Sequence, residues 1–422
     1  MEIQELYQLF QTNPIIDTDS RAIREKSIFF ALKGENFNAN IFAEDALKKG
    51  ASFAVVDEDL NPSNPNIILV DDVLETLQKL ANYHRNQLNI PIISLTGSNG
   101  KTTTKELINA VLSTKFNTIA TKGNLNNHIG VPLTLLSITK DTEIAIVEMG
   151  ANHQKEIEFL CSIAEPNYGY ITNFGKAHLE GFGGIEGVIK GKSELYDFLR
   201  KTNGLVFANF DDDIQFEKSL GIKTVSFDIK SDFIELLEAN PFVKIRFNDI
   251  EIKSNLIGNY NVNNIAAAIT IGMFFKVPEH DIKSAIENYI PSNNRSQLMK
   301  IGTNTIFMDA YNANPSSMKV ALENFYQVDG NSKIIVLGDM FELGETSLTE
   351  HQAIADLIAD LNFKQVYLVG NHFSSIKTKN SSQYTDFEQF KNKFDAGSIQ
   401  NATILIKGSR GMALERVLDL LK

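Results

Sequence analysis

The chain has 422 residues, and at roughly 150 residues per domain this length indicates between two and three domains, of which we expect three. Its composition, 43% hydrophobic and 22% charged, excludes a disordered chain, because enough apolar residues are present for several cores. The formal charge of -12 opposes attraction to phosphate backbones or anionic lipids, and the apolar runs are too short to cross a bilayer. We therefore expect neither a nucleic-acid nor a membrane partner.

The cysteine content and the first residues of the chain indicate the cellular compartment. Cys161 is the single cysteine, so the chain forms no internal disulfide, which fits a reducing cytoplasm. Residues 1–5 lack the basic start and apolar stretch of a secretion signal. We expect a cytoplasmic protein that acts as a monomer.

Residues 1–89 are predicted to form a small α/β domain. Short apolar runs mark strands, and helical spacing of apolar residues after an acidic cap marks the longer helix. Pro91 forces the residue before it out of helical geometry, which places the boundary near Asn89. The expected strands are 28–31, 53–56 and 67–70, and the expected helices are 43–49 and 72–88.

Residues 90–294 are predicted to form a central domain in which strands and helices alternate. This alternation indicates a parallel sheet with helices on both faces. Two runs of period two flank Asn248 and Asp249 and predict an antiparallel hairpin over 243–254, after which a helix over 261–275 closes the domain. The alternating strands are 92–95, 144–148 and 169–172, and the helices are 102–113 and 154–163.

Residues 295–422 resume the alternation and predict a Rossmann-like domain without its dinucleotide loop. Each strand precedes a helical stretch, the last over 414–421, and the polar residues 377–382 read as a solvated loop. The expected strands are 305–308, 333–337, 365–369 and 403–406. The whole chain is therefore an α/β protein of three domains.

The strongest motif is a phosphate loop over 94–104, between a buried strand and a helix. Its glycines let backbone N–H groups turn toward phosphate oxygens, and the following helix presents its positive end there. Lys101 should reach the β- and γ-phosphates, and the Thr102 hydroxyl should bind Mg²⁺. The residues expected to contact the nucleotide are Thr96, Gly97, Ser98, Asn99, Gly100, Lys101, Thr102 and Thr103.

The loop is a variant, because the usual spacing would place its first glycine at Leu95. The alternative is an ordinary tight turn with Lys101 as a surface cation. The loop alone indicates ATP or GTP and no particular reaction. Residues 392–395 match the letters of a guanine-specificity motif, but their helix-like setting rejects that function.

Two strands deliver metal-binding side chains to one sheet edge. Glu148 and His178 both follow predicted parallel strands, so they can converge on one cation. The alternative is that Glu148 caps the next helix and His178 is a loop histidine. Lys192 lies on a helix that should begin near Gly187, where most lysines are solvated.

The segment 123–130 begins and ends with glycine and is rich in side-chain amides. These neutral groups can bind a substrate through hydrogen bonds. Its candidate binding residues are Asn124, Asn126 and His128. The alternative is a simple turn.

Together these segments resemble the Mur ligases of bacterial cell-wall synthesis. The matching segments are 96–106, 124–130, 148–153, 177–180, 309–318 and 337–344, and the resemblance extends from 19–21 and 29–34 to 407–410. Within the family, the chain is most similar to the enzymes that add D-alanyl-D-alanine to UDP-N-acetylmuramoyl-tripeptide.

The resemblance implies an ATP-dependent ligase with three domains. One binds the UDP-sugar, one binds ATP, and the C-terminal one closes over both. The implied metal ligands are Thr102 and Glu148 for one Mg²⁺ and His178 with a carbamylated Lys192 for a second. Arg295 would meet the γ-phosphate and act in catalysis with Lys101, His178 and Lys192. The other implied contacts are Asn261 and Asn264 to adenine, Asp309 to ribose, Ser20 and Arg21 near uridine, and Asn312 and Asn314 in the C-terminal substrate motif.

The chain departs from the family pattern at three places, none of them a proposed metal ligand. Tyr260 stands where His is usual, Ala310 where Ser is frequent, and residues 38–42 replace an Asp-Gly-His-x-Phe segment that belongs to the UDP-sugar site.

Two alternatives stay open. One is another ligase of the same chemistry, such as the enzyme that adds the third stem residue or folylpolyglutamate synthase. The third-residue enzyme should carry an Asp-Asn-Pro-Arg type motif, whereas residues 311–315 here read Tyr-Asn-Ala-Asn-Pro. The other is a nucleotide switch that hydrolyses ATP slowly to change shape.

Overall fold

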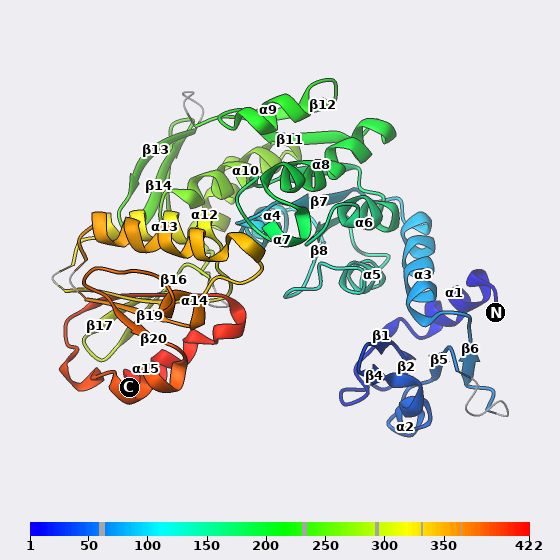
Figure 1. The fold of residues 1–422 in the computed structure, drawn as a ribbon. Coiled ribbons are helices and arrows are strands. Elements are labelled where there is room, and N and C mark those ends of the chain that lie inside the picture. Colours follow the sequence, from blue (N-terminus) through cyan, green and yellow to red (C-terminus); the bar gives the residue numbers. More distant parts are fainter. Residues whose placement is uncertain (59–63, 230–233, 292–294, 331, 364) are drawn as a thin grey trace.

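The computed structural model describes residues 1–58, 64–229, 234–291, 295–330, 332–363 and 365–422. Figure 1 shows three sheet-containing parts in chain order, with the N-terminal and C-terminal parts on different sides of the central one and apart from each other. Among the described residues, no helix combines the length and apolar character needed to span a bilayer.

The N-terminal part is built on a four-stranded sheet of order β1-β2-β5-β6, with every pairing parallel. The predicted strands and both predicted helices are present, and Asp72 caps α3 by accepting from the Glu75 N–H at 2.7 Å. The first helix and first strand were not predicted. Its elements are α1 (Ile3–Thr12), β1 (Ile15–Asp17), β2 (Ser27–Phe30), β3 (Lys33–Gly34), β4 (Phe37–Asn38), a 3-10 helix (Ala39–Phe42), α2 (Ala43–Lys48), β5 (Phe53–Val56), β6 (Ile67–Leu69) and α3 (Val73–Gln87).

The central part contains a six-stranded sheet of order β12-β11-β10-β7-β9-β8, and all of its pairings are parallel, as predicted. The strand and helix elements that follow one another are β7 (Ile92–Thr96), α4 (Lys101–Leu112), β8 (Thr118–Ala120), α5 (Gly130–Leu136), β9 (Ile144–Glu148), α6 (Glu156–Ala164), β10 (Tyr168–Ile171), α7 (Leu179–Phe182), α8 (Ile185–Thr202), β11 (Leu205–Asn209), α9 (Asp213–Ser219) and β12 (Lys223–Phe227).

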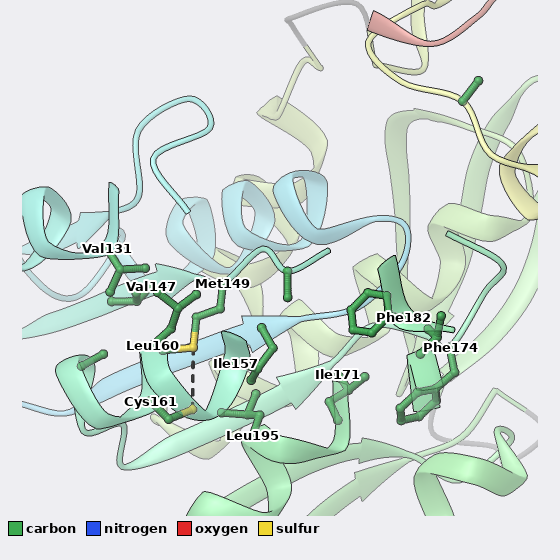
Figure 2. Packing of buried hydrophobic residues seen from close by; sticks show 14 of the residues in the cluster. Val131, Val147, Met149, Ile157, Leu160, Cys161, Ile171, Phe174, Phe182 and Leu195 are labelled. Carbon is green, nitrogen blue, oxygen red and sulfur yellow. Dashed lines mark hydrogen bonds between the residues drawn. The ribbon is translucent and has the colours of Figure 1, made fainter. Parts of the chain in front are cut away.

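Helices cover both faces of this sheet, because successive strand residues point to opposite sides. Val147 of β9 packs with α6 and α8, whereas its neighbour Ile146 packs with α4 and the later helix α10 (Tyr260–Phe274). Figure 2 shows the core that contains Val147, in which Leu160 lies near Met149 and Leu195 is also a member. The Cys161 and Met149 sulfur atoms are 3.8 Å apart there.

The predicted hairpin is formed by β14 (Phe242–Phe247) and β15 (Ile250–Ile257), which pair antiparallel. A third strand, β13 (Ile234–Ala239), joins it and was not predicted. The prediction that the helix after the hairpin is the last of this part was wrong, because α11 (Glu279–Asn288) follows α10 and packs on β15 and α4.

The C-terminal part has a six-stranded sheet of order β16-β17-β21-β18-β19-β20, parallel except for the β16–β17 pair. The four predicted strands are present, but β16 and β20 were missed, and Ser382 begins β20 instead of lying in a solvated loop. Residues 392–393 end a helix, which supports rejecting the guanine motif. The elements are β16 (Gln297–Ile301), β17 (Asn304–Asp309), α12 (Pro315–Gln327), β18 (Lys333–Gly338), α13 (Ser347–Asp360), β19 (Gln365–Val369), α14 (Asn371–Ser374), β20 (Ser382–Tyr384), α15 (Phe387–Lys393), β21 (Thr403–Lys407), α16 (Val417–Leu420) and 3-10 helices at Gly344–Thr346, Ala396–Ser398, Arg410–Met412 and Leu414–Arg416.

Candidate active site

The phosphate loop connects β7 to α4 and needs glycine at two positions. Gly97 has φ 140°, and a Cβ there would lie 2.0 Å from the Thr172 hydroxyl. Gly100 has φ 80°, and a Cβ there would lie 2.8 Å from Oδ1 of Asn264. Both values of φ favour glycine, so the glycines are fixed by backbone shape as well as by space. The loop therefore has the strand–turn–helix setting that phosphate binding requires.

Lys101 folds back over this loop. Its Nζ donates to the Gly97 carbonyl at 2.6 Å and to the Ser98 carbonyl at 3.3 Å. Burial lowers the pKa of Lys101 to about 8, opposed by the charge of Glu148 and assisted by that of Arg295. The alternative of a surface cation is wrong, because the side chain is held within the loop.

Glu148 ends β9 next to the phosphate loop and is 1% exposed. Its Oε1 accepts from Asn126 Nδ2 at 2.8 Å and from the Thr102 hydroxyl at 3.3 Å. Its Oε2 is buried without a hydrogen-bond partner among the described residues. The alternative that Glu148 caps the next helix is wrong, since Lys155 precedes α6. A hydroxyl beside a carboxylate with a free buried oxygen fits a hard divalent cation.

His178 lies immediately before α7, with φ 52°, and lines the same cleft as Glu148. Its Nδ1 is paired with Oε2 of Glu342, from the C-terminal part. Among the described contacts, none joins His178 to Glu148. Within the described ranges, no cluster of three or more His, Cys, Asp or Glu side chains is arranged to hold a metal ion.

Lys192 is on α8 and is 1% exposed, so it differs from the solvated lysines that are usual on such a helix. Its Nζ donates to the Ala151 carbonyl at 3.0 Å and lies 4.8 Å from the centre of the Phe182 ring. Burial, and next the charge of Lys101, lower the pKa of Lys192 well below its usual value. Burial therefore makes the neutral form of this amine more accessible than in a solvated lysine, and its partner Ala151 lines the cleft.

The run 123–130 contributes side chains to the cleft and is also a turn. Asn124, Asn126 and His128 all line the cavity. The His128 carbonyl accepts from Gln78 Nε2 of α3 at 2.9 Å, which ties the run to the end of the N-terminal part. Asn126 is oriented by Glu148, as described above.

The residues implied for adenine form a buried chain of amides. Asn264 Nδ2 donates to Asn261 Oδ1 at 2.8 Å, and Asn264 Oδ1 accepts from the Thr104 hydroxyl at 3.0 Å. Tyr260, where the family usually has His, shares a 2.6 Å hydrogen bond with the Ser296 hydroxyl. This contact joins α10 to the residue after Arg295.

The C-terminal part closes the other side of the cleft. The Arg295 guanidinium lies 3.5 Å from the centre of the Tyr311 ring, and its buried Nε has no hydrogen-bond partner among the described residues. Asp309 Oδ2 accepts from Lys407 Nζ at 2.5 Å. Tyr311 and Lys407 were not singled out as site residues from the sequence, although Lys407 directly follows the predicted strand 403–406 and ends β21 in the structure.

A direct bridge joins the phosphate loop to the C-terminal part. Asn314 caps α12 by accepting from the Ser317 N–H at 2.9 Å, and its Nδ2 donates to Asn99 Oδ1 at 2.7 Å. The Lys407 Nζ also donates to the Asn312 carbonyl at 3.3 Å. The motif around 309–317 is thereby held against the nucleotide loop.

One cavity of about 950 Å³ gathers most of the predicted site residues. Thr96, Gly97 and Lys192 do not line it. Ser20 is half-buried and Arg21 is exposed in the N-terminal part, where Arg21 pairs with Asp19 at 2.8 Å, and both residues also lie outside the cavity. The predicted residues that line the cavity are Ser98, Asn99, Gly100, Lys101, Thr102, Thr103, Asn124, Asn126, His128, Glu148, His178, Asn261, Asn264, Arg295, Asp309, Asn312 and Asn314.

Comparison with known proteins shows the family of the chain. The Mur ligase middle domain matches residues 95–272, and the Mur ligase glutamate ligase domain matches residues 294–410. The UDP-N-acetylmuramoyl-tripeptide–D-alanyl-D-alanine ligase of Bacillus subtilis is 33% identical over 421 residues, covering 95% of this chain and 92% of the relative. The chain belongs to the Mur ligase family. The Escherichia coli ligase of the same name is 32% identical, with 96% and 93% covered.

Solved Mur ligase structures share the fold of the whole chain. A MurF structure from Acinetobacter baumannii has a TM-score of 0.87 at 30% identity and covers 98% of this chain and 97% of its own. The Thermotoga maritima MurF ligase in complex with ADP has a TM-score of 0.85 at 28% identity, with 97% of each chain covered. The three-part α/β architecture predicted from the sequence is therefore that of a Mur ligase.

Proposed function

We propose that this chain is an ATP-dependent ligase that joins D-alanyl-D-alanine to UDP-N-acetylmuramoyl-tripeptide in peptidoglycan precursor synthesis. The observation that carries the proposal is the single cavity in which a phosphate loop, a buried carboxylate and the 309–317 motif meet. Full-length relatives named for this reaction support the same substrates, and the ADP complex of one MurF supports the nucleotide.

The reaction needs ATP because a carboxylate is a poor electrophile. The tripeptide carboxylate oxygen attacks the γ-phosphorus, the bond to ADP breaks, and an acyl phosphate forms. The amine of D-alanyl-D-alanine then attacks the acyl carbon, loses a proton, and expels phosphate from the tetrahedral oxyanion. Lys101 and Arg295 both line the cavity, and we assign them to neutralise charge on the transferring phosphoryl group. The buried Nε of Arg295, which has no described hydrogen-bond partner, supports a role for this guanidinium in binding an anion.

Mg²⁺ fits the residues present. Thr102 and Glu148 would hold one ion, because the buried Oε2 of Glu148 lacks a partner. We assign a second ion to His178 and a carbamylated Lys192, because the lowered pKa of Lys192 makes the neutral amine that captures CO₂ more accessible than in a solvated lysine. Bound cations would supply charge neutralisation for phosphoryl transfer.

Each part of the chain receives a role in this proposal. We assign residues 1–89 to the UDP-sugar, with Ser20 and Arg21 on its uridine side, and residues 90–294 to ATP, with Asn261 and Asn264 at adenine. Residues 295–422 form the ligase domain, with Asp309 at ribose and Asn312 and Asn314 at D-alanyl-D-alanine. Asn124, Asn126 and His128 face the peptide substrate. Cytoplasmic location and a monomeric state stay predictions.

Steady-state phosphate release tests this function against the switch alternative. We expect ATP turnover to require both UDP-N-acetylmuramoyl-tripeptide and D-alanyl-D-alanine, because the acyl phosphate forms on one and is consumed by the other. Reactions that omit either compound are the controls. Phosphate release at the same rate with and without them would favour a nucleotide switch. Parallel reactions with diaminopimelate or lysine as the third residue would identify the tripeptide used.

A further inference from the structure

A buried lysine ends the strand next to the one that ends in Asp309. The strands β17 and β21 pair in parallel, and Asp309 and Lys407 are register partners at their last residues. Partners on neighbouring parallel strands point to the same face, so both side chains lie at the carboxyl edge where open α/β sheets bind ligands. Lys407 is 1% exposed, and both residues line the cavity described above.

The Lys407 ammonium contacts two oxygens of the cavity wall. Its Nζ donates to Asp309 Oδ2 at 2.5 Å and to the Asn312 carbonyl at 3.3 Å. A buried ammonium is costly unless acceptors compensate for the water that it loses, and the carboxylate supplies most of that compensation here. Because a buried ion pair contributes little net stability compared with apolar side chains of similar size, stability alone does not account for this lysine.

Asp309 is held from a second side by the residue after Arg295. Its Oδ1 accepts from the Ser296 N–H at 3.3 Å, so each carboxylate oxygen receives one hydrogen bond among the described contacts. A carboxylate has about four lone-pair sites, which leaves acceptor capacity for further donors. The Asp309 side chain is 22% exposed and is therefore reachable from the cavity. Its orientation is fixed while part of it stays available to a ligand.

We propose that Lys407 is a positioning residue that fixes the Asp309 carboxylate so that its remaining lone pairs accept hydrogen bonds from the ribose hydroxyls of the nucleotide. A carboxylate that is already held in place loses little side-chain freedom on binding, so more of the hydrogen-bond energy appears as affinity. This inference rests on the proposed role of Asp309 at the ribose.

Nucleotide binding tests this role without turnover. The full chain would be titrated by calorimetry with ADP, 2′-deoxy-ADP and 3′-deoxy-ADP in the presence of Mg²⁺. The unchanged protein should prefer ADP to at least one deoxynucleotide by about 10–100-fold, the usual range for a hydrogen bond to a charged group. Lys407→Met should reduce this preference by about 10-fold, because the carboxylate is then no longer held toward the ribose. A loss of affinity through general disturbance would instead affect all three nucleotides equally.

Ser409→Ala is the matched control at the same strand end. Ser409 is buried, and its hydroxyl donates to the Ala313 carbonyl at 3.3 Å, so it tethers the neighbouring segment without a described contact to Asp309. This variant should keep the preference of the unchanged protein for ADP. Lys407→Gln, whose side chain is shorter and neutral, is the second test variant should Lys407→Met not fold, and it should lose the preference in the same way.

Four results would overturn the inference. A full preference for ADP in the folded Lys407 variant would show that the lysine does not position the carboxylate. An equal loss in Ser409→Ala would assign the effect to disturbance of the strand end. An unchanged preference in Asp309→Ala, or no preference in the unchanged protein, would remove the ribose role of Asp309 together with the inference. Failure of the proposed ligase function is a separate result, since it would appear as absent amide product whatever the titrations give.

Discussion

Lys192→Ala is expected to nearly abolish amide formation, with a loss in kcat of about 10²–10³-fold. The substitution removes the amine that would become the second carboxylate-like ligand, while the phosphate loop and Glu148 stay in place. It also leaves the Ala151 carbonyl without its donor, at a cost of about 1–3 kcal/mol in unfolding free energy. Ligation rates and a thermal unfolding curve, measured together, separate these two effects.

Lys190→Ala is the matched control, because Lys190 lies on the same helix but is exposed. It should retain the rate of the unchanged protein. The unchanged protein should also lose activity in CO₂-depleted buffer and regain it with bicarbonate, whereas Lys192→Ala should not respond. A rate for Lys192→Ala like that of the unchanged protein would rule out the carbamate.

Lys101→Ala is expected to lower kcat/KM for ATP by about 10²–10³-fold. Lys101 Nζ donates hydrogen bonds to two loop carbonyls in this structure and would donate to phosphate oxygens instead when ATP is bound. Direct measurement of ADP binding should show part of the loss, and the remainder should appear only in kcat, where the transferring group carries most charge.

Lys122→Ala provides the comparison for this experiment, since Lys122 is exposed and lies outside the cavity. It should leave kcat/KM for ATP unchanged. If Lys101→Ala kept full activity, the loop would hold phosphate through its backbone alone, and the assignment of Lys101 to the transferring phosphoryl group would be wrong.

Elements with continuous apolar runs were predictable from the sequence. β9 is buried along its whole length, so its apolar run predicted a central parallel strand with the correct bounds. β16 has no fully buried residue and lies at a sheet edge, so its pattern lacks that signal. β20 is three residues long within a polar segment, and its pairing with β19 depends on the rest of the sheet.

Some residues of the candidate site could also be predicted from the sequence, and others could not. Lys101, Thr102 and Glu148 were predictable, since a local motif and a strand end place them at one sheet edge. The contacts Asn99–Asn314 and His178–Glu342 were not, because they join segments far apart in sequence that meet only after the C-terminal part packs. The burial of Lys192 was also missed, since helical position alone does not tell which face is covered.

Isotope transfer tests the acyl phosphate most directly. Tripeptide substrate would carry ¹⁸O in its terminal carboxylate, and the phosphate released during ligation would be analysed by mass spectrometry. The proposed route predicts one labelled oxygen in each phosphate, because the carboxylate oxygen that attacks the γ-phosphorus leaves with it. Amide product accompanied by unlabelled phosphate, or ATP consumption with no amide product, would contradict the mechanism.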